Sequence, residues 1–572
     1  MRSLATFTVG TCRLFVLILL GICAPTGVAT AVAQDASPSS TAMPGGRVVL
    51  VLPFDNRSGD ASLNWIGDSF PDTLNKRLES AGFLTISHDD RTYAYDHLGL
   101  PADFQPSRAT TIRIAQQLDA NFVIIGSYNV EPDAAKTAKP GAAGDAATAT
   151  SAATSTGRIT IQARILSLDN LTLTSPLEDS AELYRLFDGQ NAIAWKVARA
   201  LDPHFNVAEP TFLATPGAVP LPAFEDYIRG IGATNPAERL KRLQSATSLV
   251  PNYAAALLAL GKEQFAQKQY AAAAVTLVKV PQSDRQALEA NFYLGLARFN
   301  TANYSSASDA FAFVATRLPL PEIVNNQAVA LSRQGKDAVP LFQRASAADP
   351  NDEDYHYNLA VALFRQGDTS GAISEVVTAL KLKPQDNEAV ALRNELASMP
   401  QNTRLTNSTS ANFSAAERIR RSYSETGFRQ AAFMLDQTRA ARLATLPPDQ
   451  RAAEYTRQGR EYLAEGLLPE AENEFQSAIT ADANSADAHA GLAQIRDASG
   501  DVAQARVQAN LSIKLKPTAV AWMELARLDL AANQLLSCAE DVTHAEQLEP
   551  SNSAAKAMRA ALQQRGQWVP AP

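Results

Sequence analysis

The sequence predicts an α/β N-terminal domain followed by an all-α solenoid, in which helix-turn-helix repeats form two arrays. The first observation is a spacing of twelve between small residues, as from Ala360 to Ala372. The second is a proline that follows twelve residues later, as Pro384 does. The third is the recurrence of this unit every 32 to 34 residues, as from Gly261 to Gly295. Such self-similarity is the signature of a solenoid, whose repeats pack mainly on their neighbours.

The stretch 355–384 shows why this spacing predicts paired helices. Two antiparallel helices approach closely only where the facing side chains are small, and larger side chains fill the grooves beside them. Leu359, Phe364 and Val376 are the large apolar residues that flank the small ones here. Pro384 ends the second helix, because proline cannot continue a helix interior.

The first 33 residues are predicted to be a signal peptide for export to the periplasm or cell envelope. Positive charge from Arg2 and Arg13 is followed by an apolar run and by the small-x-small site Ala31-Val32-Ala33. Residues 34–46 would then be a disordered tether rich in serine, proline and alanine. Two alternatives place the protein at a membrane: an uncleaved N-terminal anchor, or a lipid on Cys23.

Residues 47–205 are predicted to form one α/β domain. The predicted strands span residues 47–52, 83–86, 122–130 and 158–168, and the predicted helices span 63–81, 107–118 and 182–201. Alternating apolar residues in the strands and an apolar stripe in the helices are the basis of this prediction. Residues 131–157 have almost no large apolar side chains, so we expect a flexible insertion between two strands.

This domain resembles the TolB amino-terminal and FlgO-like group of bacterial envelope domains. The resemblance rests on Val51-Leu52-Pro53-Phe54-Asp55-Asn56, Ser58-Gly59-Asp60, Ile66-Gly67-Asp68 and Ala120-Asn121-Phe122-Val123-Ile124-Ile125-Gly126-Ser127-Tyr128. It implies a binding or assembly domain without an active site.

The remainder of the chain divides by composition. Four prolines make residues 206–222 a predicted stiff linker. The first array would span 223–399, and the second would span 451–566 with a capping helix over 553–564. Between them, residues 400–450 are predicted to be a polar break, with bridging helices over 415–446.

The repeats resemble the tetratricopeptide repeat (TPR) family. One repeat matches the family pattern at Trp522, Leu525, Ala526, Cys538, Ala545 and Pro550, and two others match at Tyr270, Ala273, Gly295, Tyr304, Ala307 and Phe311. The resemblance implies binding of protein partners along the concave groove of the solenoid. It does not identify the partner, because these repeats serve many binding tasks.

Charge and cysteine content narrow the classes of function. The formal net charge is −8, or −10 once Arg2 and Arg13 are removed with the predicted signal peptide. Nucleic-acid partners are therefore not expected. Cys538 is the one cysteine beyond that segment and occupies a small-residue position, so a buried core thiol is expected.

The sequence gives no positive sign of enzymatic activity. It has no phosphate-binding glycine loop with a lysine, and no GxSxG, HExxH or CxxC motif. A polar cluster at His88, Asp89, Asp90, Asp96 and His97 has the ligand types of a metal site, but a solvated loop after a strand explains it more simply. We therefore predict no catalytic residues, no metal and no cofactor.

Partner-binding candidates lie on the first helices of the first array. They are Lys262, Phe265, Phe292, Phe299, Tyr357, Phe364 and Arg365. Phe265, Phe299 and Phe364 occupy equivalent places, where packing between repeats is the competing interpretation. The asparagine-and-basic clamp that some TPR proteins use for carboxylates is not expected, since Leu258 and Phe292 stand where polar groups would be needed.

The predicted function is that of a non-enzymatic protein-binding scaffold of the bacterial cell envelope. One alternative is a regulatory or sensory module of a signalling system. A second is an unrecognised envelope hydrolase or transferase that uses its repeats for substrate capture. Association with a membrane would require the N-terminal segment to be uncleaved or lipidated.

Overall fold

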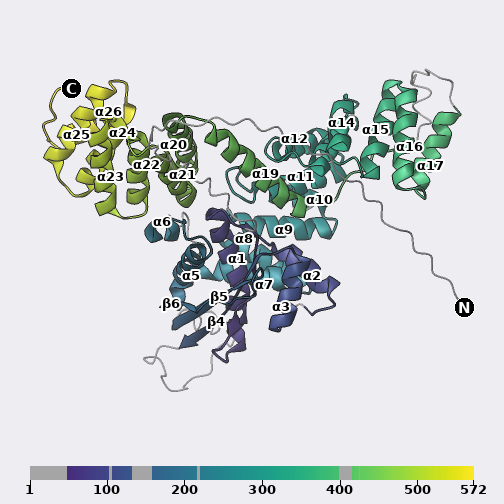
Figure 1. Cartoon of the computed structure of the whole chain (residues 1–572), viewed down its shortest axis with the longest axis horizontal. Helices are drawn as coiled ribbons and strands as arrows, with labels where there is room; N and C mark the ends of the chain where they lie inside the picture. Colours follow the sequence, from purple (N-terminus) through teal and green to yellow (C-terminus); the bar gives the residue numbers. More distant parts are fainter. Residues whose placement is uncertain (1–47, 102–105, 132–156, 215–218, 399–414, 424) are drawn as a thin grey trace, which may run out of the picture. The chain divides into compact units, whose positions relative to one another are not determined.

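A computed structural model describes residues 48–101, 106–131, 157–214, 219–398, 415–423 and 425–572 (Figure 1). The predicted signal peptide and tether, nearly all of the predicted insertion and the polar stretch 400–414 lie outside the described residues. Among those described, no helix is long and apolar enough to cross a membrane.

The first part of the described chain is a mixed β-sheet. Its strands are β1 (Val48–Val51), β2 (Asp55–Asn56), β3 (Leu84–Thr85), β4 (Phe122–Glu131), β5 (Arg158–Ser167) and β6 (Leu177–Glu182). The order is β3-β1-β4-β5-β6, with β2 also paired to β4. β1 runs parallel to β3 and β4, whereas β5 runs antiparallel to its neighbours β4 and β6. The sequence did not predict β6, because its alternating residues include three acids and few apolar side chains.

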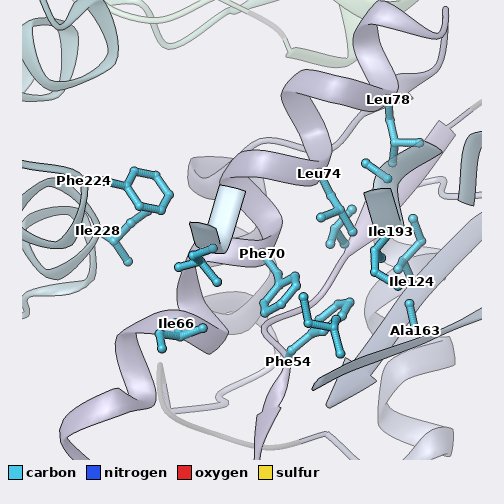
Figure 2. Packing of buried hydrophobic residues seen from close by; sticks show 14 of the residues in the cluster. Phe54, Ile66, Phe70, Leu74, Leu78, Ile124, Ala163, Ile193, Phe224 and Ile228 are labelled. Carbon is cyan, nitrogen blue, oxygen red and sulfur yellow. The ribbon is translucent and has the colours of Figure 1, made fainter. Parts of the chain in front are cut away.

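Helices cover both faces of this sheet. One face packs on α1 (Asn64–Ser80) and α5 (Leu186–Leu201), with Phe70, Leu74 and Ile193 buried against Ile124 (Figure 2). The other face packs on α2 (His88–His97) and α3 (Arg108–Gln117). These layers confirm the predicted α/β class for this region.

The solvated loop expected around His88 is wrong, because residues 88–97 form helix α2. The side chain of Ser87 caps this helix by accepting a hydrogen bond from the Asp90 amide at 3.0 Å. Two acids in the first turn and a histidine in the last suit the helix dipole. A helix start thus accounts for a cluster whose composition alone resembles a metal site.

Two glycines, Gly67 and Gly126, allow close packing around Phe54. A Cβ atom at Gly67 would lie 2.3 Å from the Phe54 carbonyl oxygen, and one at Gly126 would lie 2.3 Å from the Phe54 ring. Phe54 itself stacks on Phe70 with ring centroids 4.0 Å apart. These motif residues are therefore needed for the core of the domain.

The predicted stiff linker is wrong in part. Helix α6 (Glu209–Leu213) forms within it, and Thr211 and Phe212 of this helix are fully buried. The apolar core of the sheet also includes Phe212. It extends to Phe224 and Ile228 of the next helix (Figure 2). The four prolines did not indicate this, because proline is tolerated in the first turn of a helix.

Helix pairs follow, stacked side by side (Figure 1). The first array contains α7 (Leu221–Gly232), α8 (Pro236–Leu249), α9 (Ala254–Ala266), α10 (Tyr270–Leu277), α11 (Ala287–Asn300), α12 (Tyr304–Ala315), α13 (Pro321–Ser332), α14 (Val339–Ala348), α15 (Glu353–Gln366), α16 (Thr369–Leu382) and α17 (Asn387–Ala397). After α19 (Glu425–Ala444), the second contains α20 (Pro448–Ala464), α21 (Leu468–Ala481), α22 (Ala486–Ala498), α23 (Val502–Leu515), α24 (Ala519–Ala531), α25 (Leu535–Leu548) and α26 (Ser553–Gln564).

The small residues lie where the helices of a pair approach most closely. Ala360, Ala372 and Cys538 are 0% exposed, and the Cys538 thiol is free. A Cβ atom at Gly295 would lie only 2.6 Å from the ring of Phe311. The spacing that predicted the solenoid is thus explained by steric contact, and the predicted all-α arrays are confirmed.

The bridging helix predicted over 415–446 is wrong in its first part. Residues 415–423 have no regular secondary structure, and the helix described there, α19, begins at Glu425. Polar groups of Glu417, Arg418 and Arg420 in this short segment bond instead to the first array.

Candidate functional site

Residues 415–423, which we call the bound segment, lie along the inner helices α13 and α15. Asn358 of α15 makes two hydrogen bonds with the backbone of Arg418. Its side-chain oxygen accepts from the Arg418 amide at 2.6 Å, and its side-chain nitrogen donates to the Arg418 carbonyl at 2.8 Å. One side chain thereby satisfies both backbone groups of one residue.

Asn326 of α13 repeats this arrangement two residues further along the bound segment. It accepts from the Arg420 amide and donates to the Arg420 carbonyl, both at 2.8 Å. Alternate residues of an extended chain direct their backbone groups to the same side, so 418 and 420 can both face the helices.

A third asparagine links these two bidentate contacts. Asn325 donates to the Arg418 carbonyl at 3.1 Å and accepts from Asn358 at 2.8 Å. Asn325, Asn326 and Asn358 are each 0% exposed, and we call the surface that carries them the asparagine face. Because an asparagine side chain contains both a donor and an acceptor, it is suited to hold a peptide backbone whatever its sequence.

The side chain of Arg418 enters a cluster of carboxylates. Its guanidinium lies 2.7 Å from Asp354, 2.7 Å from Asp386 and 2.8 Å from Glu388, and 3.8 Å from the centre of the Tyr357 ring. Burial alone would lower the pKa of Arg418, but hydrogen bonds to the three carboxylates raise it overall. The same hydrogen bond from Arg418 lowers the pKa of Asp386.

Arg420 and Glu417 are also paired. Arg420 forms ion pairs with Asp352 and, at 3.2 Å, with Asp354. The buried carboxylate of Glu417 contacts Arg365 and the Ser332 hydroxyl, with Arg333 3.7 Å away. Burying a charged group costs roughly several kcal/mol of lost hydration, and an opposite charge beside it offsets that cost. The site therefore accepts an acidic side chain beside Arg365 and basic side chains beside Asp352 and Asp354.

Apolar contacts complete the site. Ile419 packs against the apolar clusters around Phe311 and Phe342. The ring of Tyr423 meets Phe292 edge to face, with centroids 5.1 Å apart. Ala416, Arg421 and Ser422 remain exposed. The segment is thus held through selected side chains and its backbone.

The predicted partner-binding residues separate into two groups. Tyr357, Arg365 and Phe292 contact the bound segment, through Arg418, Glu417 and Tyr423 respectively. Of the other four, Phe299 lies in an apolar cluster with Ile419 of the bound segment, and Lys262, Phe265 and Phe364 make contacts elsewhere in the chain.

Lys262 pairs with Asp89 at 2.5 Å and Glu289 at 2.6 Å, so its charge is satisfied within the chain. Phe265 packs on Tyr270 and Tyr293. Phe299 shares an apolar cluster with Ile419, and Phe364 is fully buried in the core of its own helix pair. Phe265 and Phe364 thus pack within the array, whereas Phe299 packs beside the bound segment, and a role of these residues in partner binding stays a prediction.

Sequence reasoning missed the asparagines and the segment that they hold. Asn326 and Asn358 lie 32 residues apart, each two residues before the small residue of its repeat. That recurrence is a usable signal, but the apolar residues Leu258 and Phe292, which stand one position earlier in the preceding repeats, argue against an asparagine clamp. A helix was predicted for the bound segment because its charged residues are compatible with an exposed helix.

A metal site or a catalytic base would support chemistry other than binding. Within the part of the chain that the structure describes, no group of three histidine, cysteine, aspartate or glutamate side chains is arranged to hold a metal ion. The carboxylates at the asparagine face are engaged in ion pairs with arginines, and the hydrogen bond from Arg418 lowers the pKa of Asp386.

Comparisons with known proteins support the repeats. Two family models described as tetratricopeptide repeat match residues 331–396 and 456–520. The first match contains Asn358, and the second lies in the other array. These residues are therefore tetratricopeptide repeats, a class of protein-interaction module. No curated protein matches the sequence of this chain.

Solved structures also match parts of this chain. One of them is MamA from Desulfovibrio magneticus RS-1, which is 18% identical in sequence. The match covers 30% of this chain and 99% of the MamA chain, with a TM-score of 0.28. YrrB, described as a TPR protein with an unusual peptide-binding site, is 14% identical, covering 35% of this chain and 98% of that chain, with a TM-score of 0.28.

Proposed function

We propose that this protein is a non-enzymatic scaffold of the bacterial cell envelope, whose first array docks partner proteins by holding an extended peptide segment on the asparagine face. The N-terminal region would be a TolB amino-terminal/FlgO-like assembly domain. The observation that carries the proposal is the bidentate bonding of Asn326 and Asn358 to a peptide backbone.

A surface that docks an extended peptide has to form hydrogen bonds with the peptide's backbone. An extended peptide exposes an amide and a carbonyl at every residue, and leaving them unsatisfied against a protein surface costs about 1–3 kcal/mol for each group. Asparagines in successive repeats meet this need at every second residue of the peptide. Neighbouring charges then supply selectivity, because an uncompensated charge is costly at a desolvated contact.

Export is supported by the order of charge, apolar run and small residues in the first 33 residues. N-terminal sequencing of the mature protein from envelope fractions is expected to begin at Gln34. A mature chain that retains Arg13 would indicate the anchored alternative, and a lipid on Cys23 would indicate the lipoprotein alternative.

Docking is tested by affinity capture with the full mature chain. Proteins recovered by the wild type should be lost from the double variant Asn326→Ala with Asn358→Ala. The matched control is Asn473→Ala with Asn510→Ala, which removes two exposed asparagines from helices of the second array. Recovery of the same proteins by all three forms would contradict docking on the asparagine face.

A further inference from the structure

The bound segment belongs to the chain itself, and its contacts specify what an external partner must offer. Resting on the proposed function, we propose that the first array recognises an extended partner segment of the pattern acid-Arg-apolar-Arg, and that residues 417–420 are an internal copy of this pattern that competes with the partner.

The pattern follows from the alternation of side chains along an extended chain. Arg418 and Arg420 point to the acidic side of the site, where Asp352, Asp354 and Asp386 receive them. Residues 417 and 419 point to the other side. There the carboxylate of Glu417 meets Arg365, and Ile419 meets apolar surface.

Arginine fits the acidic side better than lysine does. The guanidinium of Arg418 uses Nε, Nη1 and Nη2 together to reach Asp354, Asp386 and Glu388 while lying over the Tyr357 ring. A lysine ammonium is a compact charge that cannot present a planar fork and stack on an aromatic face at the same time. The partner's second position should therefore be arginine.

The position after the first arginine has to be apolar and of moderate size. Ile419 packs against clusters that contain Phe292 and Phe342, which are fully or almost fully buried. A charged residue here would lose its hydration without gaining a partner. In contrast, the exposed position of Arg421 places no requirement on the partner.

Competition follows from covalent linkage. A ligand that is covalently linked to its receptor binds intramolecularly, with an effective concentration on the order of 1 mM, so it occupies its site even when its own affinity is weak. A free peptide must displace it, which weakens the apparent affinity of the free peptide. Disabling the internal copy should therefore make a free peptide bind at least about tenfold more tightly.

The probe is a fluorescein-labelled peptide with the sequence of residues 415–423, titrated into the full mature chain by fluorescence anisotropy. The triple variant Glu417→Ala, Arg418→Ala and Arg420→Ala should bind it at least about tenfold more tightly than the wild type does. Adding Asn326→Ala and Asn358→Ala to that variant should abolish binding. Equal affinity of triple variant and wild type, with both folded, would overturn the internal competition.

Peptide variants test the pattern. Replacing both arginines that correspond to Arg418 and Arg420 by lysine should weaken binding to the triple variant about tenfold or more. A scrambled peptide of the same composition that binds equally well would overturn the recognition pattern. The proposed docking would then still stand, because its own test depends on partner capture by the asparagines.

Two further measurements control for folding and for oligomeric state. If the triple variant fails to fold by circular dichroism, Arg418→Ala alone provides the test, since it leaves Glu417 and Arg420 in place and should give a smaller gain in affinity. Light scattering on the wild type should show that the segment is retained within one chain. A dimer that dissociates in the triple variant would overturn the internal competitor and assign the segment to a second copy.

Discussion

The two arrays share a packing framework but differ at the position two residues before the small residue of each inner helix. In the first array, Ala259 and Tyr293 stand there in α9 and α11, whereas Asn326 and Asn358 stand there in α13 and α15 and hold a peptide backbone. In the second array the corresponding residues are Arg457, Gly491 and Glu524, none of which combines a donor and an acceptor in one side chain. A repeat can therefore keep its core packing while a position on its inner helix changes from one that bonds a peptide backbone to one that does not carry both a donor and an acceptor.

The shared framework is best tested at a core phenylalanine in each array. Phe311 packs against Gly295, and Phe475 packs between Gly459 and Gly491. Both rings are 0% exposed, so Phe311→Ala and Phe475→Ala should each lower the free energy of unfolding by about 3–5 kcal/mol. Thermal melting followed by circular dichroism measures this, with the 70% exposed Leu536→Ala as control. If only one of the two variants lost this much stability, the two arrays would not share the same packing framework.

Buried acids give the second array a pH dependence of its own. Burial, aided by nearby Asp529, raises the pKa of Asp541 to about 7 from an ordinary value of 3.8. An acid with a raised folded-state pKa contributes stability below its unfolded pKa and loses it as the pH rises through about 7.

Asp541→Asn should therefore stabilise the protein at pH 8, by an amount on the order of 1–3 kcal/mol, and have little effect at pH 4. Melting temperatures of variant and wild type across this range measure the difference. Glu388→Gln in the first array, where the carboxylate is exposed, is the control. A difference between variant and wild type that does not change with pH would show that Asp541 does not titrate as described.

The asparagine position itself predicts a more local effect. Asn358→Ala removes two hydrogen bonds to the backbone of Arg418 and should weaken docking of the bound segment by about 1–2 kcal/mol. Hydrogen exchange at the Arg418 amide should accelerate accordingly, whereas Asn473→Ala should leave it unchanged. An unchanged rate in Asn358→Ala would mean that the asparagine face does not hold the segment in solution.

The smallest effect is expected at the edge of the carboxylate cluster. The Glu388 side chain is 70% exposed, so Glu388→Gln should weaken docking of the bound segment by less than about 0.5 kcal/mol. Asp386 is 6% exposed at its side chain, and Asp386→Asn should weaken docking more. The protease sensitivity of the bound segment orders the two variants, and the reverse order would exclude burial as the cause.

Much of the fold could be predicted from the sequence, because it depends on contacts within repeats. The spacing of Ala360 and Ala372 reports the close approach of two helices, and a proline marks where the pair ends. The small core residue Cys538 follows from the same rule. Helix α6 was missed because its burial comes from distant residues, and a run of prolines gives no sign of that.

The site was harder to predict than the fold. Tyr357 and Arg365 were found because they share an inner helix face at a spacing of eight residues. The partner of Arg365, Glu417, lies 52 residues later in a segment without regular structure. No local periodicity marks such a segment, since its conformation is set by the surface that it contacts and not by its own propensity.

The route of the bound segment has a mechanical consequence. Its contacts reach α13 through Asn326, α15 through Asn358, and the N-cap residue of α17 through Asp386. A repeat solenoid normally stretches or bends by small rotations between neighbouring pairs. A peptide that contacts α13, α15 and α17 resists such rotations, so the stiffness of this stretch should fall when the peptide leaves.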